Sequence, residues 1–253
     1  MQDLWVECKG INYLTKIHDS AWRIIEAQNI TATRKLVDSL GEQTLLEEMI
    51  ESTKPFLSKE NLKMHPLLYT PFRYPPLKYG SRFGNRFEHA LWYGSLKLET
   101  AMAEKAYYQF NFLRASKADF GPVEILFTAF SAKIKTSRGI KLTEKPFDKH
   151  AKMISSPISY EVSQRIGNVM RQENIEAFYY YSARDLQLGT NVGVFTPKAF
   201  AYHTPQDDSF QTWQCLATHN VIEFVRSSVL MVETKHFPLE KFLVDGKLPF
   251  PAN

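Results

Sequence analysis

The sequence lacks the long apolar runs of a membrane protein. A membrane-spanning helix needs about 18 consecutive apolar residues, whereas even rich apolar segments such as residues 123–130 already contain Glu124 and Thr128. Residues 1–5 also lack the basic start and apolar run of a secretory signal. We therefore expect a cytoplasmic protein with no membrane-spanning segment.

Side chains that bind metal ions are scarce. Cys8 and Cys215 are the two cysteines of the chain, and neither belongs to a zinc-binding pattern. The seven histidines include no His-x-x-x-His pair. We therefore expect no metal site and two reduced, structural thiols.

A large excess of one charge is also missing, because 31 basic residues are offset by 27 acidic ones, for a net charge of +4. This balance gives weak support for an anionic ligand, and no RNP-type or helix-turn-helix signature accompanies it. We therefore expect no direct nucleic-acid binding. The 44% of hydrophobic residues is enough for a substantial core.

The first quarter of the chain has a helical pattern. Apolar residues recur at three- and four-residue spacings from residue 18 to residue 52, with Gly41 dividing two predicted helices. Residues 55–76 are rich in proline, which predicts an irregular linker. We place a domain boundary near residue 65, between a helical N-terminal appendage (residues 1–65) and a main domain (residues 66–253).

Short amphipathic helices usually need an apolar partner surface to persist in water. The appendage is therefore predicted to mediate self-association or to dock a partner protein, and packing against the chain's own main domain is the alternative.

The main domain has a mixed α+β pattern in which short strands outnumber helices. A helix is predicted over residues 97–115, with an apolar face made of Leu98, Met102, Ala106, Phe110 and Leu113 and with Glu104 on the opposite side. A second helix is predicted over residues 157–172, with Ser156 as its cap. Strands are predicted over residues 90–93, 123–134, 177–181 and 191–196, and within residues 221–232.

Residues that could carry chemistry are most concentrated between residue 73 and the first half of the helix predicted over residues 97–115. Arg73, Arg82 and Arg86 lie near glycine-rich turns, where guanidinium groups and accessible backbone suit pyrophosphate or a nucleotide. Tyr93 and Glu104 follow, and Ser182 comes much later, at the end of an apolar strand. Taken singly, each has an ordinary structural explanation. The arginines would be surface charges and Tyr93 a core aromatic, while Glu104 would be a solvated helix residue and Ser182 a turn serine.

Taken in order, these residues resemble the RES-domain family, which is named for its arginine, glutamate and serine. The resemblance covers residues 66 to 235. The matching stretches are Ser81-Arg82-Phe83-Gly84-Asn85, Leu91-Trp92-Tyr93-Gly94-Ser95, Thr100-Ala101-Met102-Ala103-Glu104 and Tyr181-Ser182-Ala183-Arg184-Asp185. An earlier family arginine, in a Tyr-Arg-Val-like strand that opens the domain, corresponds to Arg73 in Phe72-Arg73-Tyr74.

The match departs from the family pattern in two places. The interval from Arg82 to Tyr93 is one residue longer than usual, so Arg86 is the alternative turn arginine. Tyr181 stands where the family commonly has proline.

The resemblance implies an ADP-ribosyltransferase-like fold with a mainly antiparallel sheet and flanking helices. It also implies an NAD-degrading toxin of a toxin–antitoxin pair, which cleaves the nicotinamide–ribose bond by phosphorolysis or hydrolysis and is restrained by an Xre-like antitoxin. NAD is then a substrate, inorganic phosphate a possible co-substrate, and no cofactor is needed. The implied catalytic residues are Glu104, Arg82 and Tyr93, and the implied substrate-binding residues are Arg73, Ser182 and Arg86.

Two other functions fit the same residues. An ADP-ribosyltransferase would pass the ribose to a macromolecule through almost the same cleft. A non-catalytic nucleic-acid-binding module would use the arginines with Phe72, Tyr74, Phe83 and Trp92 as a basic aromatic surface, but it would leave Glu104 and Ser182 unexplained. A purely structural or interaction protein is a further alternative.

Overall fold

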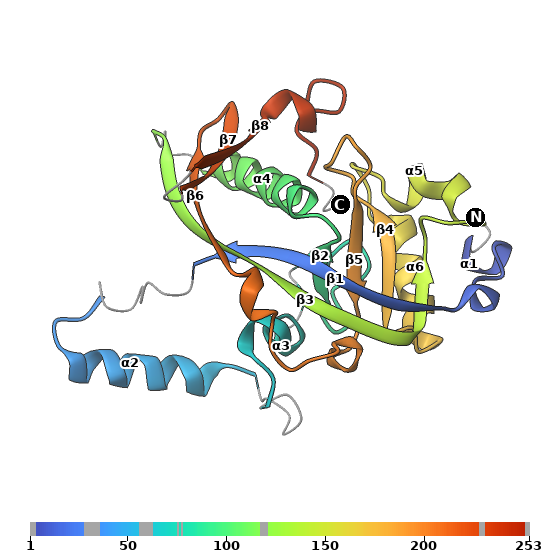
Figure 1. The fold of residues 1–253 in the computed structure, drawn as a ribbon, viewed down its shortest axis with the longest axis horizontal. Helices are drawn as coiled ribbons and strands as arrows, with labels where there is room; N and C mark the ends of the chain where they lie inside the picture. Colours follow the sequence, from blue (N-terminus) through green and yellow to red (C-terminus); the bar gives the residue numbers. More distant parts are fainter. Residues whose placement is uncertain are drawn as a thin grey trace.

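The computed structural model describes residues 4–27, 36–55, 63–74, 76, 78–116, 121–227 and 231–250. An eight-stranded sheet organises them (Figure 1), in the order β1-β2-β5-β4-β3-β6-β7-β8. Only β3 and β4 pair in parallel within the described chain, and the other pairings are antiparallel. The strands are β1 (Thr15–Glu26), β2 (Trp92–Ser95), β3 (Val123–Lys141), β4 (Ala177–Tyr181), β5 (Thr190–Val194), β6 (Gln211–Ala217), β7 (Val221–Ser227) and β8 (Val232–Pro238).

The helices flank this sheet and are α1 (Leu4–Glu7), α2 (Leu40–Thr53), α3 (Pro66–Arg73), α4 (Leu98–Ala115), α5 (Ala151–Ile154) and α6 (Glu161–Gln172). The α+β class and the mainly antiparallel sheet are as predicted. None of the helices in the described part of the chain is both long and apolar enough to span a membrane.

The strand β1 closes part of the sheet on itself. It pairs with β2 on one side and, over most of its length, with β3 on the other. The pairings of β1, β2, β5, β4 and β3 therefore form a ring, and β6, β7 and β8 extend from β3. This closure brings β1, the start of α4 and the end of β4 close to one another.

The prediction of a helix is wrong over residues 18–26, because these residues belong to β1. Every residue from Ile17 to Glu26 has a partner in β3, and Ile17, Ala21 and Ile24 are buried. The side chains of Trp22, Ile24 and Ile25 suit a strand, and pairing with β3 outweighs their helix-like spacing. Residues 28–35 of the predicted helical region lie outside the described residues.

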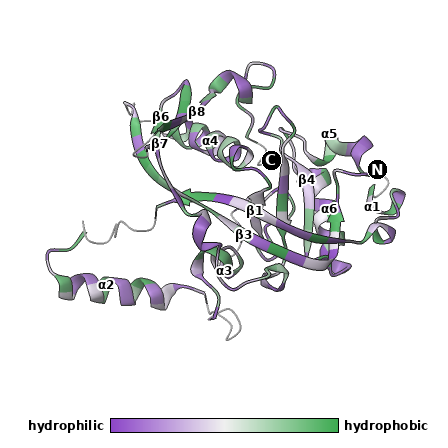
Figure 2. Ribbon diagram, in the orientation of Figure 1, coloured by the Kyte–Doolittle hydropathy of each residue, from purple (hydrophilic) through white to green (hydrophobic). Residues whose placement is uncertain are grey.

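The second part of the predicted N-terminal helical region is helical. Ser39 and Glu42 form a capping box at the start of α2, and Gly41 lies in the first turn instead of dividing two helices. No residue of α2 is buried, and the helix projects from the body of the molecule (Figure 1), with apolar and polar residues alternating along it (Figure 2). The described chain before residue 65 thus contains the short helix α1, a 3-10 helix at Gly10–Tyr13, the strand β1 and the protruding helix α2.

The irregular linker predicted over residues 55–76 contains a helix, α3. Pro66 occupies the first turn, where a missing N–H costs nothing, and His65 Nδ1 accepts a hydrogen bond from Leu67 N. The density of prolines alone therefore did not predict the structure of residues 66–73.

The helix α4 is the main support of the sheet and agrees closely with its prediction. Met102, Ala106, Phe110 and Leu113 are buried, and they belong to a core cluster that also contains Trp213 of β6. Glu104 projects from another side of the helix, which leaves its carboxylate free to face a pocket.

The helix α6 begins later than predicted. Tyr160 is its N-cap, and Ser156 Oγ instead accepts hydrogen bonds from Ile158 N and Ser159 N in the preceding turn. The predicted strands at 90–93, 123–134, 177–181, 191–196 and within 221–232 are confirmed as β2, β3, β4, β5 and β7 with shifted ends.

Candidate functional site

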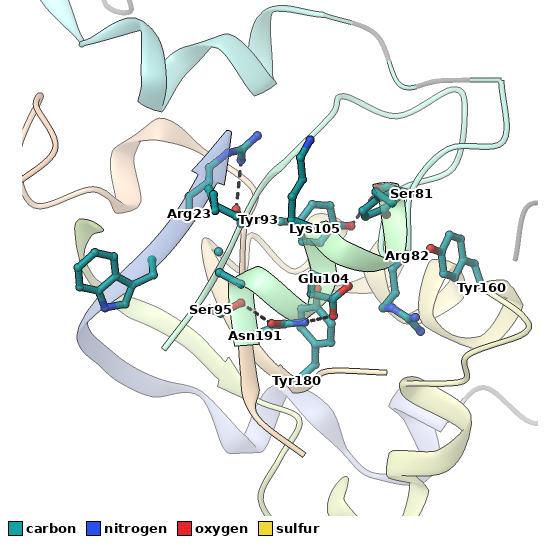
Figure 3. A pocket seen from close by; sticks show the side chains of 15 residues that line it. Arg23, Ser81, Arg82, Tyr93, Ser95, Glu104, Lys105, Tyr160, Tyr180 and Asn191 are labelled. Carbon is teal, nitrogen blue, oxygen red and sulfur yellow. Dashed lines mark hydrogen bonds between the residues drawn. The ribbon is translucent and has the colours of Figure 1, made fainter. Parts of the chain in front are cut away.

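A pocket lies where β1, β2, α4 and the turn at residues 81–84 meet (Figure 3). Its polar lining comes from segments far apart in the sequence. Among the described residues that line it, the cations are Arg23, Arg82 and Lys105 and the carboxylate is Glu104. The polar and aromatic lining residues include Ser81, Ser95, Asn191, Tyr93, Tyr108, Tyr160 and Tyr180.

Glu104 is held in one orientation by two donors from different strand ends. Its Oε1 accepts a hydrogen bond from Ser182 Oγ at 2.7 Å and another from Asn191 Nδ2 at 2.6 Å. Among the described residues, no donor is assigned to Oε2. The carboxylate therefore has one oxygen occupied by the protein and one available to a ligand.

Ser182 lies behind Glu104 and does not line the pocket. It is 2% exposed, and its Oγ accepts hydrogen bonds from Arg184 N and Asp185 N. These two contacts direct the hydroxyl proton toward Glu104. The loop is held in turn to α4, since Thr100 Oγ1 donates to Asp185 Oδ2 at 2.8 Å.

Arg82 is carried by a tight turn on the opposite side of the pocket. Ser81 and Gly84 pair across this turn, and the preceding Gly80 has a φ of +72°, which favours glycine. Arg82 is 6% exposed, donates to Ser156 O at 2.8 Å and stacks over the Tyr160 ring at 4.8 Å. It is thus a buried cation with donors still available, which suits an anion.

Tyr93 holds this turn in place. Its hydroxyl accepts a hydrogen bond from Phe83 N at 3.0 Å and lies 2.9 Å from Ser81 Oγ, so it contacts both neighbours of Arg82. Burial raises the pKa of Tyr93 to about 12. The hydroxyl therefore remains protonated at neutral pH and can act only as a hydrogen-bonding group there.

Arg23 of β1 is the arginine that the sequence analysis missed. Its Nη1 donates to Tyr93 O at 3.1 Å, its guanidinium lies 5.4 Å from the Trp92 ring centre, and burial lowers its pKa to about 10. It is still charged at neutral pH. Trp22-Arg23-Ile24 fits the Tyr-Arg-Val-like strand better than residues 72–74 do. The match was missed because this segment was predicted to be a helix.

The structure does not bring Arg73 and Arg86 to this pocket. Arg73 ends a helix, not a strand, and it binds Glu51 of α2 at 2.9 Å and Pro55 O at 2.7 Å. Arg86 is exposed and stacks on Phe87. Both line a separate hollow that also contains Phe72 and His89. Of the two candidates for the turn arginine, Arg82 is therefore the one beside Glu104.

Lys105, Tyr160 and Asn191 were also missed as site residues. Lys105 follows Glu104 on α4 and lies 3.5 Å from Glu26 of β1. Asn191 comes nine residues after Ser182, shortly beyond the matching stretch at residues 181–185, and that closeness was the available signal for it. Tyr160 had no sequence signal, because its place under Arg82 depends on the packing of α6.

No group of three or more His, Cys, Asp or Glu side chains in the described ranges is placed to hold a metal ion. Cys8 and Cys215 are both buried free thiols.

The match to one known protein family agrees with these motifs. No curated protein matches the chain. One similar solved structure is a chain in the crystal structure of the M. tuberculosis MbcT–MbcA toxin–antitoxin complex, at 10% sequence identity and a TM-score of 0.41, over 84% of this chain and 92% of that one. Residues 61–214 match the RES domain, so the chain belongs to the RES-domain family.

Proposed function

We propose that this protein cleaves NAD at its nicotinamide–ribose bond and that the pocket around Glu104 is the active site. The observation that carries the proposal is the Glu104 carboxylate, which two donors hold through Oε1 while Oε2 is left to a ligand. Loss of nicotinamide develops positive charge on the ribose. A carboxylate that is held in place before the reaction can stabilise that charge without having to reorganise.

The cations around the pocket would bind the anionic parts of the substrates. In Figure 3, Arg23 and Lys105 extend on one side of Glu104, and Arg82 with Tyr160 lies on another. Arg82 would bind the NAD pyrophosphate, and Arg23 would take the role first expected of Arg73 in holding this group or an attacking inorganic phosphate. Tyr93 holds the turn that carries Arg82 and lines the pocket, where it would orient the ribose.

Ser182 acts through Glu104 in this proposal, because its hydroxyl faces the carboxylate and not the pocket. The step itself breaks the ribose–nitrogen bond, and the electron pair leaves with nicotinamide. Phosphate or water then forms the new bond to the ribose carbon, giving ADP-ribose-1''-phosphate or ADP-ribose. Neither route needs a cofactor.

The test is to incubate the protein with NAD, with and without inorganic phosphate, and to identify every product by mass. Phosphorolysis predicts ADP-ribose-1''-phosphate only when phosphate is present, and hydrolysis predicts ADP-ribose in both cases. Label that stays on a macromolecule after incubation with labelled NAD would instead support ADP-ribosyl transfer. Intact NAD in every reaction would overturn the proposal.

The decisive variant is Glu104→Gln, which is nearly isosteric and removes the charge. We expect turnover to be abolished while the fold and much of the affinity for NAD remain. Turnover within about tenfold of the unsubstituted protein would show that Glu104 is not the catalytic carboxylate.

A basic aromatic surface for nucleic acid is disfavoured by the packing. Phe83 and Trp92 are both 0% exposed, so neither can stack on a base.

A role as the toxin of a toxin–antitoxin pair, restrained by an Xre-like antitoxin, is part of this proposal because of the family membership. Within the N-terminal region, α2 is the element that would associate with another protein or a second copy. Its Leu40, Leu45 and Met49 are all more than half exposed, and the rest of the described chain leaves them uncovered.

A further inference from the structure

One row of residues crosses four strands beneath Glu104. The register pairs Trp22 of β1 with Ser95 of β2, Ser95 with Asn191 of β5, and Asn191 with Tyr180 of β4. All four line the pocket. The two central members are polar and almost completely buried, with Ser95 2% and Asn191 1% exposed. Polar side chains that are buried in a sheet need hydrogen-bond partners.

The hydrogen bonds of this row can run in one direction only. A carboxylate accepts but does not donate, so the Asn191 atom that lies 2.6 Å from Glu104 Oε1 must be the amide nitrogen. The Asn191 oxygen then faces Ser95 Oγ, 2.6 Å away, and it must accept the Ser95 proton. Glu104 therefore determines which way the Asn191 amide faces, and Ser95 supports that orientation by donating to the amide oxygen.

We propose that Ser95 and Asn191 are positioning residues that hold Glu104 Oε1, so that Oε2 alone is presented to the ribose. Neither residue needs to contact the reacting atoms. Ser182 supplies the second donor from the other strand end, and the two donors together prevent the carboxylate from rotating. This inference rests on the proposed NAD cleavage, but the network itself can be tested without it.

The first test is the nearly isosteric Asn191→Leu variant, with Asn111→Leu as a matched control. Asn111 is a partly buried residue of α4 whose amide donates to Tyr107 O one turn earlier, and it does not line the pocket. Loss of one hydrogen bond to a charged group predicts a fall in kcat of about 10- to 100-fold for Asn191→Leu, with KM within about threefold. Asn111→Leu should leave both unchanged. Equal kcat in a folded Asn191→Leu variant would overturn the inference.

A pH profile separates positioning from simple packing. Asn191→Asp places a second carboxyl group against Glu104, and two such groups share a proton at low pH. The shared proton restores a donor to Oε1, so turnover should be substantial near pH 5 and should fall as the proton is lost toward pH 8. Asn191→Leu should remain slow at every pH. The remaining charged lining residues, Arg23, Arg82 and Lys105, and the lining tyrosines are the same in both variants.

The third measurement needs no turnover. The side-chain amide signal of Asn191 in a ¹H–¹⁵N spectrum should shift strongly in Ser95→Ala and in Glu104→Gln, and should not shift in Asn111→Leu. If the unsubstituted protein leaves NAD intact but these shifts occur, the proposed function fails and the network stands. If NAD is cleaved but the signal does not respond, only the positioning inference fails.

Discussion

At the scale of single residues, burial distinguishes Arg82, which lines the pocket, from Arg86, which does not. Arg82 is enclosed between Ser156 O and the Tyr160 ring, whereas Arg86 is exposed on Phe87. A guanidinium held in place beforehand loses less entropy when it binds an anion than a mobile one does. Arg73 differs from Arg23 in its partners and not in its burial, because its side chain is 10% exposed but is held by Glu51 and Pro55 O outside the pocket.

We expect Arg82→Ala to weaken NAD binding by about 10- to 100-fold, because a charge-assisted contact in a partly enclosed site is lost. Arg86→Ala should change affinity by less than about twofold. Calorimetric titration of NAD into both variants measures this, and thermal melting shows whether Arg82→Ala is folded. A larger loss in Arg86→Ala would reverse the assignment.

Arg23→Met should likewise impair NAD or phosphate binding by about tenfold or more, because the variant keeps the apolar stem but removes the cation. Arg73→Met is its matched control. That variant should leave turnover unchanged and should only loosen α2, because it removes the ion pair with Glu51. Similar KM values for NAD and phosphate in the two variants would show that Arg23 does not bind substrate.

At the scale of elements, local pattern predicted the segments whose own sequence shows one secondary structure clearly. The helix α4 and the strand β4 fall into this class, and their predicted bounds are close to those observed. The strand β1 does not, because its apolar spacing resembles that of a helix and its partner β3 lies about a hundred residues further along the chain. Spacing within residues 15–26 carries no information about that pairing, so the strand was read as a helix.

The same reason explains which site residues the sequence revealed. Arg82, Tyr93, Glu104 and Ser182 follow a family pattern along the chain. The structure places Arg82 and Tyr93 in one pocket with Glu104, and Ser182 against the Glu104 carboxylate. Arg23 was not predicted as a site residue, because β1 was not predicted as a strand. Tyr160 depends on how α6 packs under the Arg82 turn, which no local motif records.

This division leads to a sharper test of the N-terminal region than removal of all of it. A truncated chain that starts at Lys63 lacks β1 and Arg23, and we expect it to be misfolded and inactive. Replacing residues 36–55 with a flexible linker removes α2 but keeps β1, and that variant should retain NAD turnover. Light scattering should show a lower mass for it than for the full chain if α2 mediates self-association.

Two results would contradict this division of roles. An active, well-folded chain starting at Lys63 would show that β1 is dispensable. Loss of NAD turnover in a folded variant without residues 36–55 would place α2 in the catalytic machinery.

At the scale of the whole molecule, several titratable groups are buried in uncharged form. Burial raises the pKa of Tyr93, of Tyr107 and of the Cys215 thiol to about 12 in each case. In the unfolded chain these groups ionise near their ordinary values of 9.0 for the thiol and 10.0 for the two hydroxyls. The unfolded state therefore releases these protons at a lower pH than the folded state does.

The sign of the resulting pH dependence follows from linkage. Because the folded pKa values are raised, the stabilising contribution is fully present below about pH 9 and is lost as pH rises toward 12. Urea unfolding at intervals from pH 8 to pH 11.5 should show a free energy of unfolding that falls steadily above pH 9. Tyr107→Phe removes one of the three groups, together with its hydrogen bond to Pro249 O, so it should be less stable at pH 8 but should lose stability less steeply above pH 10. Parallel pH profiles for Tyr107→Phe and the unsubstituted protein would show that the Tyr107 hydroxyl does not contribute to the alkaline loss.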